Sequence, residues 1–243
     1  MKIEGGFPMR QTMRQTMGQT MRQTMKEKTK KHIKDPGSAI THFIGMLMAI
    51  FAAVPLLIKA ASEPSPVYFI SLLIFALSMI GLYAASTTYH TFDVSERVNT
   101  VLKKMDHMMI FVMIAGSYTP VCLLVLEKPI GLILIGIIWG IALLGIIIKF
   151  FFVFCPKWVS SILDIGMGWT CVLAFGPLLS GLTPKEFGWL LAGGIIYTIG
   201  GVIYALKLNV FNNLHPNFGS HEIFHLFVMG GSACHFVVMF MIA

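Results

Sequence analysis

The chain has 243 residues, of which 56% are hydrophobic and only 12% are charged, and its formal net charge at pH 7 is +7. A soluble domain is usually about 25% charged, so this composition excludes a soluble globular protein and indicates an integral membrane protein. Half of the 18 Lys and Arg residues lie in residues 1–34, so the positive charge belongs mostly to one short tail and does not imply a nucleic-acid-binding surface.

The amino-terminal segment, residues 1–35, is basic and repetitive. A Met-Arg-Gln-Thr unit begins at Met9, Met13 and Met21, and Met17 begins the same unit with Gly in place of Arg. On a helix, a period of four gives a drifting methionine stripe beside an arginine stripe, which suits the surface of an anionic inner leaflet. The same composition is typical of a disordered tail. Since this segment lacks the apolar core of a signal peptide, we expect the first spanning helix to drive insertion.

Residues 36–243 form the predicted transmembrane domain. A hydrocarbon core of about 30 Å requires about 20 apolar residues in a helix, and the chain supplies that length seven times. We therefore predict an all-α integral membrane protein, a seven-transmembrane-helix bundle with short loops. The predicted spans are Ala39–Ile58, Val67–His90, His107–Leu126, Ile130–Ile148, Trp158–Leu179, Phe187–Leu206 and Phe218–Ala243.

The basic residues near the helix ends predict the orientation in the cell membrane. With the tail in the cytoplasm, only Lys59, Lys128 and Lys185 fall at outer helix ends. The further basic residues that fall at inner ends are Arg97, Lys103, Lys104, Lys149, Lys157 and Lys207. We therefore expect a cytoplasmic amino terminus and an external carboxyl terminus. The helix-interior prolines expected to kink the outward halves of their helices are Pro55, Pro120 and Pro177.

The cysteines show neither a disulfide framework nor a CxxC metal motif. All but Cys155 lie inside apolar runs, and we expect all four cysteines to be small packing residues. They are Cys122, Cys155, Cys171 and Cys234.

Ionisable groups inside a membrane are costly, and they indicate a functional site. In the predicted topology His90 ends the second helix at the inner side, and His221 and His225 occupy the first two turns of the seventh. The i, i+4 spacing of the pair places both rings on one helix face, where two imidazoles can bind one metal. Such a pair alone favours a structural role. With His90 at the same depth, three neutral imidazoles and an open fourth position predict a Zn²⁺ site.

Asp106 and Ser86 are the candidate catalytic residues. Asp106, at the predicted start of the third helix, would reach a zinc-bound water or orient a ligand histidine. Its alternative role is to cap that helix. Ser86 lies one turn before His90, so its hydroxyl is placed to bond an imidazole or a substrate carbonyl, or to bond back to a helix carbonyl.

The remaining polar residues of the predicted spans fit the ligand set less well. His42 and Glu222 are expected to be structural, and Glu222 to cap the seventh helix. Asp164, inside the fifth helix, either orients a histidine or lines a proton path. His107 points away from Asp106's face, and His235 lies about 15 Å deeper than the histidine pair, so neither fits the same metal.

Four motifs together resemble one family over about residues 35–243. They are Thr41-His42-Phe-Ile-Gly45, Ser86-Thr-Thr-Tyr-His90, Asp106 and His221-Glu-Ile-Phe-His225, in this order. The combination is similar to the hemolysin III branch of the progestin and adiponectin receptor superfamily. The resemblance implies a cytoplasmic-side zinc, whose family ligands map onto His90, His221 and His225, with the family's Ser and Asp mapping onto Ser86 and Asp106.

The resemblance also suggests a chemistry. Adiponectin receptors and the related alkaline ceramidases are associated with zinc-dependent lipid amide hydrolysis, and bacterial members are known as haemolysins linked to membrane fluidity and lipid homeostasis. We therefore expect a zinc-dependent hydrolase of lipid amides or esters that acts on membrane lipids.

Two other functions are compatible with the sequence. One is a pore-forming cytolysin, and the other is a membrane-fluidity sensor or receptor with structural zinc. The seventh helix contains no Lys for a retinal Schiff base, which excludes retinal chemistry. Paired histidines also suit haem, but a third histidine and a carboxylate in the same layer favour zinc.

Overall fold

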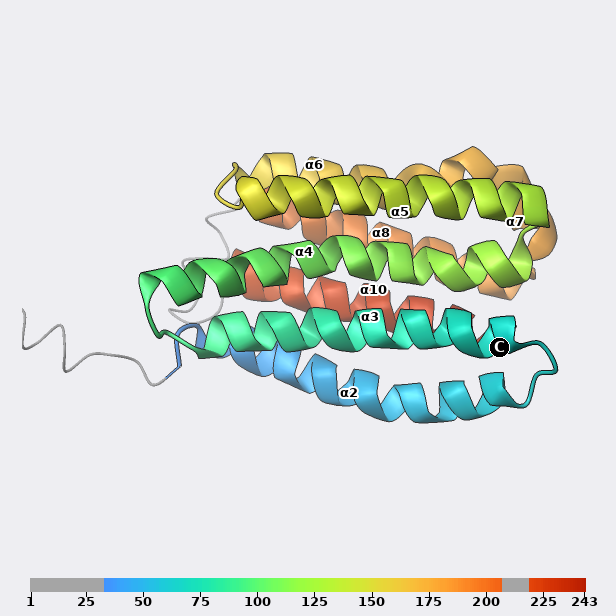
Figure 1. Cartoon of the computed structure of the whole chain (residues 1–243), viewed down its shortest axis with the longest axis horizontal. Helices are drawn as coiled ribbons and strands as arrows, with labels where there is room; N and C mark the ends of the chain where they lie inside the picture. Colours follow the sequence, from blue (N-terminus) through green and yellow to red (C-terminus); the bar gives the residue numbers. More distant parts are fainter. Residues whose placement is uncertain (1–32, 207–218) are drawn as a thin grey trace, which may run out of the picture.

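The computed structural model describes residues 33–206 and 219–243 (Figure 1). In these residues it has seven helical spans that are long and apolar enough to cross a membrane, which confirms the predicted fold class. The predictions for the repetitive tail, and for Lys207 as a basic residue at an inner helix end, concern residues outside the described ones. The helices are α2 (Pro36–Ala61), α3 (Pro66–Thr91), α4 (Glu96–Pro120) with the π-helical η1 (Val121–Val125), α5 (Lys128–Phe151), α6 (Lys157–Gly168) with the 3-10 helical η2 (Trp169–Ala174) and α7 (Phe175–Gly181), α8 (Pro184–Leu206) and α10 (Ser220–Ile242).

The helices form a closed bundle in which each span packs beside its neighbours. Helices α2 to α5 pack in sequence order, α8 packs against both α6 and α10, and α10 contacts α2. Successive spans run in opposite directions (Figure 1). We call the end where α2, α4, α6 and α10 begin the proximal end. The chain ends at the opposite, distal end.

The third span differs from its prediction at the proximal end. Helix α4 begins at Glu96, and the side chain of Ser95 accepts a hydrogen bond from the Val98 amide there. Asp106 therefore lies about 15 Å along this helix and does not cap it, so only the alternative role given for Asp106, that of a helix cap, is wrong. The reason is that hydropathy identifies only the apolar part of the helix, whereas α4 continues as a polar extension.

Two of the three helix-interior prolines coincide with irregular helix. Pro120 is followed by the π-helical turn of η1, and Pro177 lies in the short α7, which follows the 3-10 segment η2. Proline lacks the amide hydrogen that would continue the helical ladder, which explains both changes. Pro55 lies within the continuous helix α2.

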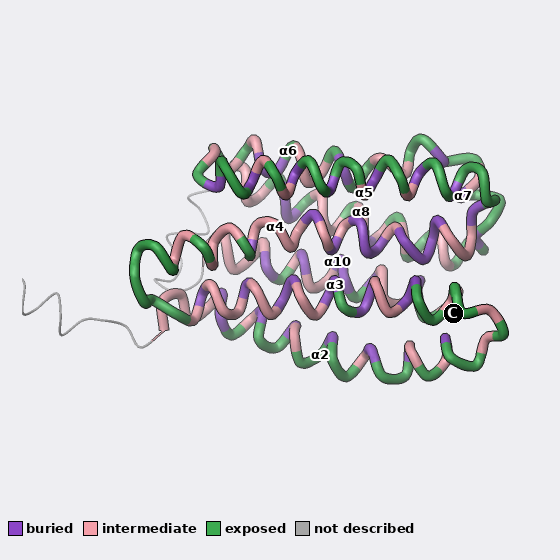
Figure 2. The backbone as a smooth tube through the Cα atoms, in the orientation of Figure 1, coloured by how far each residue is buried: buried purple, intermediate pink, exposed green. Residues whose placement is uncertain are grey.

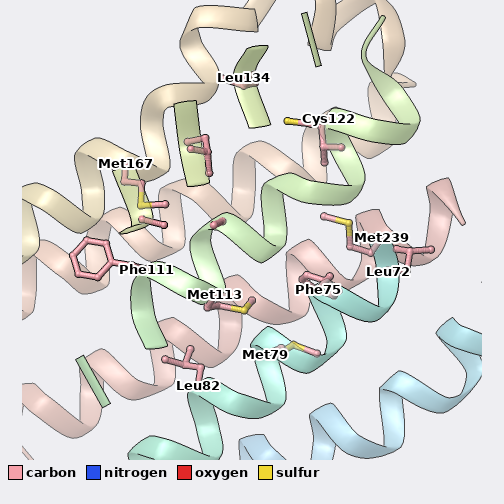
Figure 3. Close-up of a cluster of buried hydrophobic side chains, with 14 of the residues drawn as sticks. Leu72, Phe75, Met79, Leu82, Phe111, Met113, Cys122, Leu134, Met167 and Met239 are labelled. Atoms are coloured by element: carbon pink, nitrogen blue, oxygen red, sulfur yellow. The ribbon is translucent and has the colours of Figure 1, made fainter. Parts of the chain in front are cut away.

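The interior of the bundle is apolar, and so is its outer surface. Buried and exposed positions recur at helical spacing along each span (Figure 2). The buried cluster includes Phe75 of α3, Phe111 of α4 and Met239 of α10 (Figure 3). Phe51 and Leu173, by contrast, are 73% and 72% exposed, as expected for side chains that face lipid.

Gly145 of α5 allows α5 to approach α4 closely. A Cβ atom at Gly145 would overlap the ring of Phe111 on α4. Small residues at such contacts are typical of membrane helix packing.

Candidate metal centre

Three histidines from two helices meet at the proximal end. His90 lies at the end of α3, and His221 and His225 lie in the first two turns of α10. One ligand atom from each lies within 4.8 Å of the others, and the Nε2 atoms of His90 and His221 are 3.2 Å apart. Tetrahedral zinc with bonds of about 2.0–2.1 Å places its nitrogen ligands about 3.4 Å apart. His90 and His221 thus have the separation of two ligands of one metal, and His225 lies close enough for the three to hold a metal ion.

The start of α10 is fixed by Glu222. Its Oε2 accepts a hydrogen bond from the Gly219 amide at 2.8 Å, so the predicted capping role is confirmed. Its Oε1 accepts a hydrogen bond from Ser38 Oγ of α2 at 2.6 Å. This contact ties the first turn of α10, and hence His221, to α2.

Two side chains orient the ligand rings from outside. Asp35 Oδ2 lies 3.0 Å from Nδ1 of His90. Thr41 Oγ1 lies 3.3 Å from Nδ1 of His225, and the Thr41 hydroxyl already donates to the carbonyls of residues 37 and 38. Since that hydroxyl hydrogen is in use, Thr41 accepts a hydrogen bond from His225. Both rings therefore carry their proton on Nδ1, which leaves the Nε2 lone pair for a metal.

The donor set fits zinc. Neutral imidazoles whose other ring nitrogen donates to a carboxylate or another oxygen are typical of protein zinc ligands. His90 and His225 are each 2% exposed, and His221 is half-buried. Its Nδ1 is buried without a hydrogen-bond partner among the described residues.

Asp35 is a partner of His90 that was not predicted from the sequence. It precedes Pro36 at the start of α2, where an Asp normally caps the helix, but its side chain makes no capping bond. Its amide instead donates to the carbonyl of His90 at 2.9 Å, which holds the carboxylate beside the ring. The hydrogen bond with His90 lowers the pKa of Asp35 below its ordinary value, although partial burial opposes this. An Asp-Pro start was the available signal, but it indicated only a cap.

Asp106 and Ser86 lie beside the histidines. Asp106 is 8% exposed, its Oδ2 lies 3.3 Å from His107 Nδ1, and it interacts electrostatically with His90 and His221. The side chain of Ser86 interacts electrostatically with Asp106, but its hydroxyl is buried without a well-formed hydrogen bond in the described part of the chain. The alternative back-bond to a helix carbonyl is therefore not observed.

The remaining candidates lie outside the three-nitrogen cluster. The ring of His42 stacks on His225 with centroids 3.5 Å apart and planes within 10°, so it packs against a ligand ring. His235 packs against Tyr197, at a centroid distance of 5.3 Å. Asp164 interacts electrostatically with Lys149 of α5, and none of the described histidines is hydrogen-bonded to it.

Comparison with known proteins agrees with the arrangement of these motifs. Residues 30–236 match the haemolysin-III related family. The chain belongs to the haemolysin III family. A Hemolysin-3 from Bacillus cereus is 38% identical over 199 residues, which cover 82% of this chain and 87% of the relative. A Hemolysin-3 homolog from Bacillus subtilis (strain 168) is 39% identical, with 82% and 89% covered. Placement in the progestin and adiponectin receptor superfamily is consistent with this family.

Proposed function

We propose that this haemolysin III family protein is a zinc-dependent membrane hydrolase of lipid amides or esters that acts in membrane lipid homeostasis. The observation that carries the proposal is the cluster of His90, His221 and His225, with outer partners on two of the three rings. Three protein ligands leave one tetrahedral position for water or substrate, which is how catalytic zinc differs from structural zinc.

The residues around the cluster suit hydrolysis. Bound zinc would polarise a carbonyl and lower the pKa of bound water to about 7. Asp106, buried beside His90 and His221, accepts a proton from the attacking water and returns it to the leaving group. The Ser86 hydroxyl, close to Asp106 and without a hydrogen bond to a helix carbonyl, donates to the substrate carbonyl. The apolar bundle around them accommodates an acyl chain.

We also propose that the proximal end faces the cytoplasm. The basic residues at inner helix ends support this orientation. Substrate lipids would then enter from the inner leaflet, and the basic tail, residues 1–35, would bind anionic lipids of that leaflet. Reporters active on one side of the membrane, fused to each end of the chain, test this. Both ends on one side would contradict it.

The proposed activity is tested with purified protein in lipid nanodiscs. Metal content is measured first, and release of fatty acid is then followed from a panel of ceramides and ester lipids. We expect one zinc per chain and turnover that a chelator abolishes. Ser86→Ala and Asp106→Asn should retain zinc and lose turnover. Zinc without turnover on any lipid would contradict the hydrolase and favour the sensor.

The names of the two relatives support a second candidate function, that of a cytolysin. A pore releases a dye from lipid vesicles without breaking any lipid bond. Dye release that is equal in the wild type and in His90→Ala, without fatty-acid release, would favour the cytolysin over the hydrolase.

A further inference from the structure

A second polar cluster lies at the proximal end, between α5 and α6. Lys149, two residues before the end of α5, is only 1% exposed. Its Nζ donates hydrogen bonds to Cys155 Sγ at 3.2 Å and to Ser160 Oγ. The Sγ atom itself lies 3.5 Å from Ser160 Oγ. The thiol therefore lies against a buried ammonium and a hydroxyl.

A buried ammonium requires a negative partner, because an isolated charge is costly away from water. In residues 33–206 and 219–243, no carboxylate forms an ion pair with Lys149 within 4 Å. Asp164 of α6 interacts with Lys149 at longer range, and its Oδ1 is buried without a hydrogen-bond partner. Cys155 Sγ is thus the ionisable atom in direct contact with the ammonium.

The surroundings of Cys155 favour the thiolate. Cys155 lies in the loop between α5 and α6, outside the spanning segments, and is partly exposed. Burial opposes ionisation, but hydrogen bonds from Ser160 and Lys149 and the charge of Lys149 outweigh it and lower the pKa of the Cys155 thiol. Lys103 of α4 and Tyr204 of α8 also interact with Cys155, while Asp164 opposes the thiolate.

The other three cysteines have different surroundings. Cys122, Cys171 and Cys234 lie within spanning helices. A reactive cysteine is a partly exposed thiolate near a cation, whereas a cysteine buried among apolar side chains is inert. Cys155 alone among the four has a lysine hydrogen-bonded to its sulfur in the described part of the chain.

We propose that Cys155 is a redox modification site, a thiolate paired with the Lys149 ammonium that hydroperoxides oxidise to a sulfenic acid. The thiolate sulfur attacks the terminal oxygen of the hydroperoxide, an S–O bond forms and the O–O bond breaks. The departing oxygen leaves as hydroxide or alkoxide and takes a proton from Lys149 or water. The sulfur is oxidised by two electrons and the peroxide is reduced by two.

Hydroperoxides can reach the loop that contains Cys155 from two sources. Phe152 and Phe154, which precede Cys155 in the same loop, are 66% and 71% exposed. Aromatic side chains at this level are typical of the membrane interface, where hydrogen peroxide arrives from water and lipid hydroperoxides arrive from the bilayer. Since the site shares no residue with the histidine cluster, it does not depend on the proposed hydrolase.

The first test is the pH dependence of alkylation in the full-length protein, with iodoacetamide and peptide mass spectrometry resolving each cysteine. We expect Cys155 to react with a midpoint below about pH 8.5, the value of an ordinary thiol. Lys149→Met should raise that midpoint by about one unit or more, because a cation within hydrogen-bonding distance favours the thiolate. Asp164→Asn should lower it. Lys149→Arg, which keeps the charge, is the matched control. A wild-type midpoint at or above about 8.5 would overturn the proposal without any variant.

The second test traps the product. Wild-type protein is treated with hydrogen peroxide or with a lipid hydroperoxide in nanodiscs, and dimedone captures any sulfenic acid. We expect a dimedone adduct on Cys155 and none on Cys171, and the more effective oxidant identifies the source. Absence of an adduct on Cys155 with both oxidants would overturn the proposal.

Discussion

The two polar clusters at the proximal end, the histidine cluster and the cluster around Lys149, stabilise buried polar groups in different ways. The histidine cluster uses side chains that are neutral when they bind a metal, and each of two rings has its outer nitrogen bonded to Asp35 or Thr41. The cluster on α5 and α6 instead holds the charge of Lys149 against a thiol. The first arrangement prepares lone pairs for a cation, and the second stabilises an anion. Changes at one cluster should therefore leave the chemistry of the other intact.

The largest expected effect is loss of the metal. His90→Ala, His221→Ala or His225→Ala should each abolish stoichiometric zinc, because two imidazoles do not complete the site. Metal analysis of the purified variants measures this. His235→Ala, which removes an imidazole that packs against Tyr197 away from the cluster, is the control and should keep its zinc. An empty site in that control beside a full one in His90→Ala would refute the assignment.

A weaker effect is expected from Asp35→Asn. The amide no longer stabilises the His90 tautomer that presents Nε2, and loss of such an outer partner typically costs about 10–100-fold in metal affinity. Competition with a zinc-binding dye gives the affinity. Asp93→Asn, which alters an exposed carboxylate bonded to Asn99, should leave it unchanged. Equal affinities in all three proteins would show that Asp35 does not support the ligand.

A packing change on the other side of the bundle should affect stability without affecting zinc. Gly145→Ala places a methyl group against the ring of Phe111, one turn before Lys149, and overpacking of this kind costs about 1–3 kcal/mol. Gly140→Ala on the same helix meets no atom within 4 Å and is the control. Thermal unfolding in detergent should show a lower Tm for Gly145→Ala alone, with zinc content unchanged in both variants. Loss of zinc from Gly145→Ala would show that the two clusters are coupled.

The smallest effect is expected from the tail. Deleting residues 1–29 removes the Met-Arg-Gln-Thr repeat but keeps Asp35 and Thr41, so zinc content and Tm should match the full chain. Reduced zinc in the truncated protein would place part of the tail in the site.

The sequence predicts the seven spans and the three-histidine cluster well, since both depend on patterns along the chain. Apolar length identifies a membrane helix, and topology then brings His90 to the same end as the pair on α10. The polar extension of α4 was missed because helix outside the apolar run leaves no hydropathy signal. As a result capping was an alternative role for Asp106, although the helix begins ten residues earlier, at Glu96.

The partners of the clusters were less predictable because they depend on how segments meet in space. Asp35 reaches His90 only because its own amide bonds to the carbonyl at the end of α3. Lys149 was counted as an orientation signal and Cys155 as a packing residue. Their contact depends on the loop that turns back from α5 to α6.

X-ray absorption spectroscopy at the zinc edge of the purified protein is the sharpest test of the three-histidine zinc site. Such a site should show three imidazole nitrogens at about 2.0–2.1 Å and one further light atom, with no sulfur in the coordination shell. A sulfur ligand at about 2.3 Å, or fewer than three imidazoles in fully loaded protein, would contradict it.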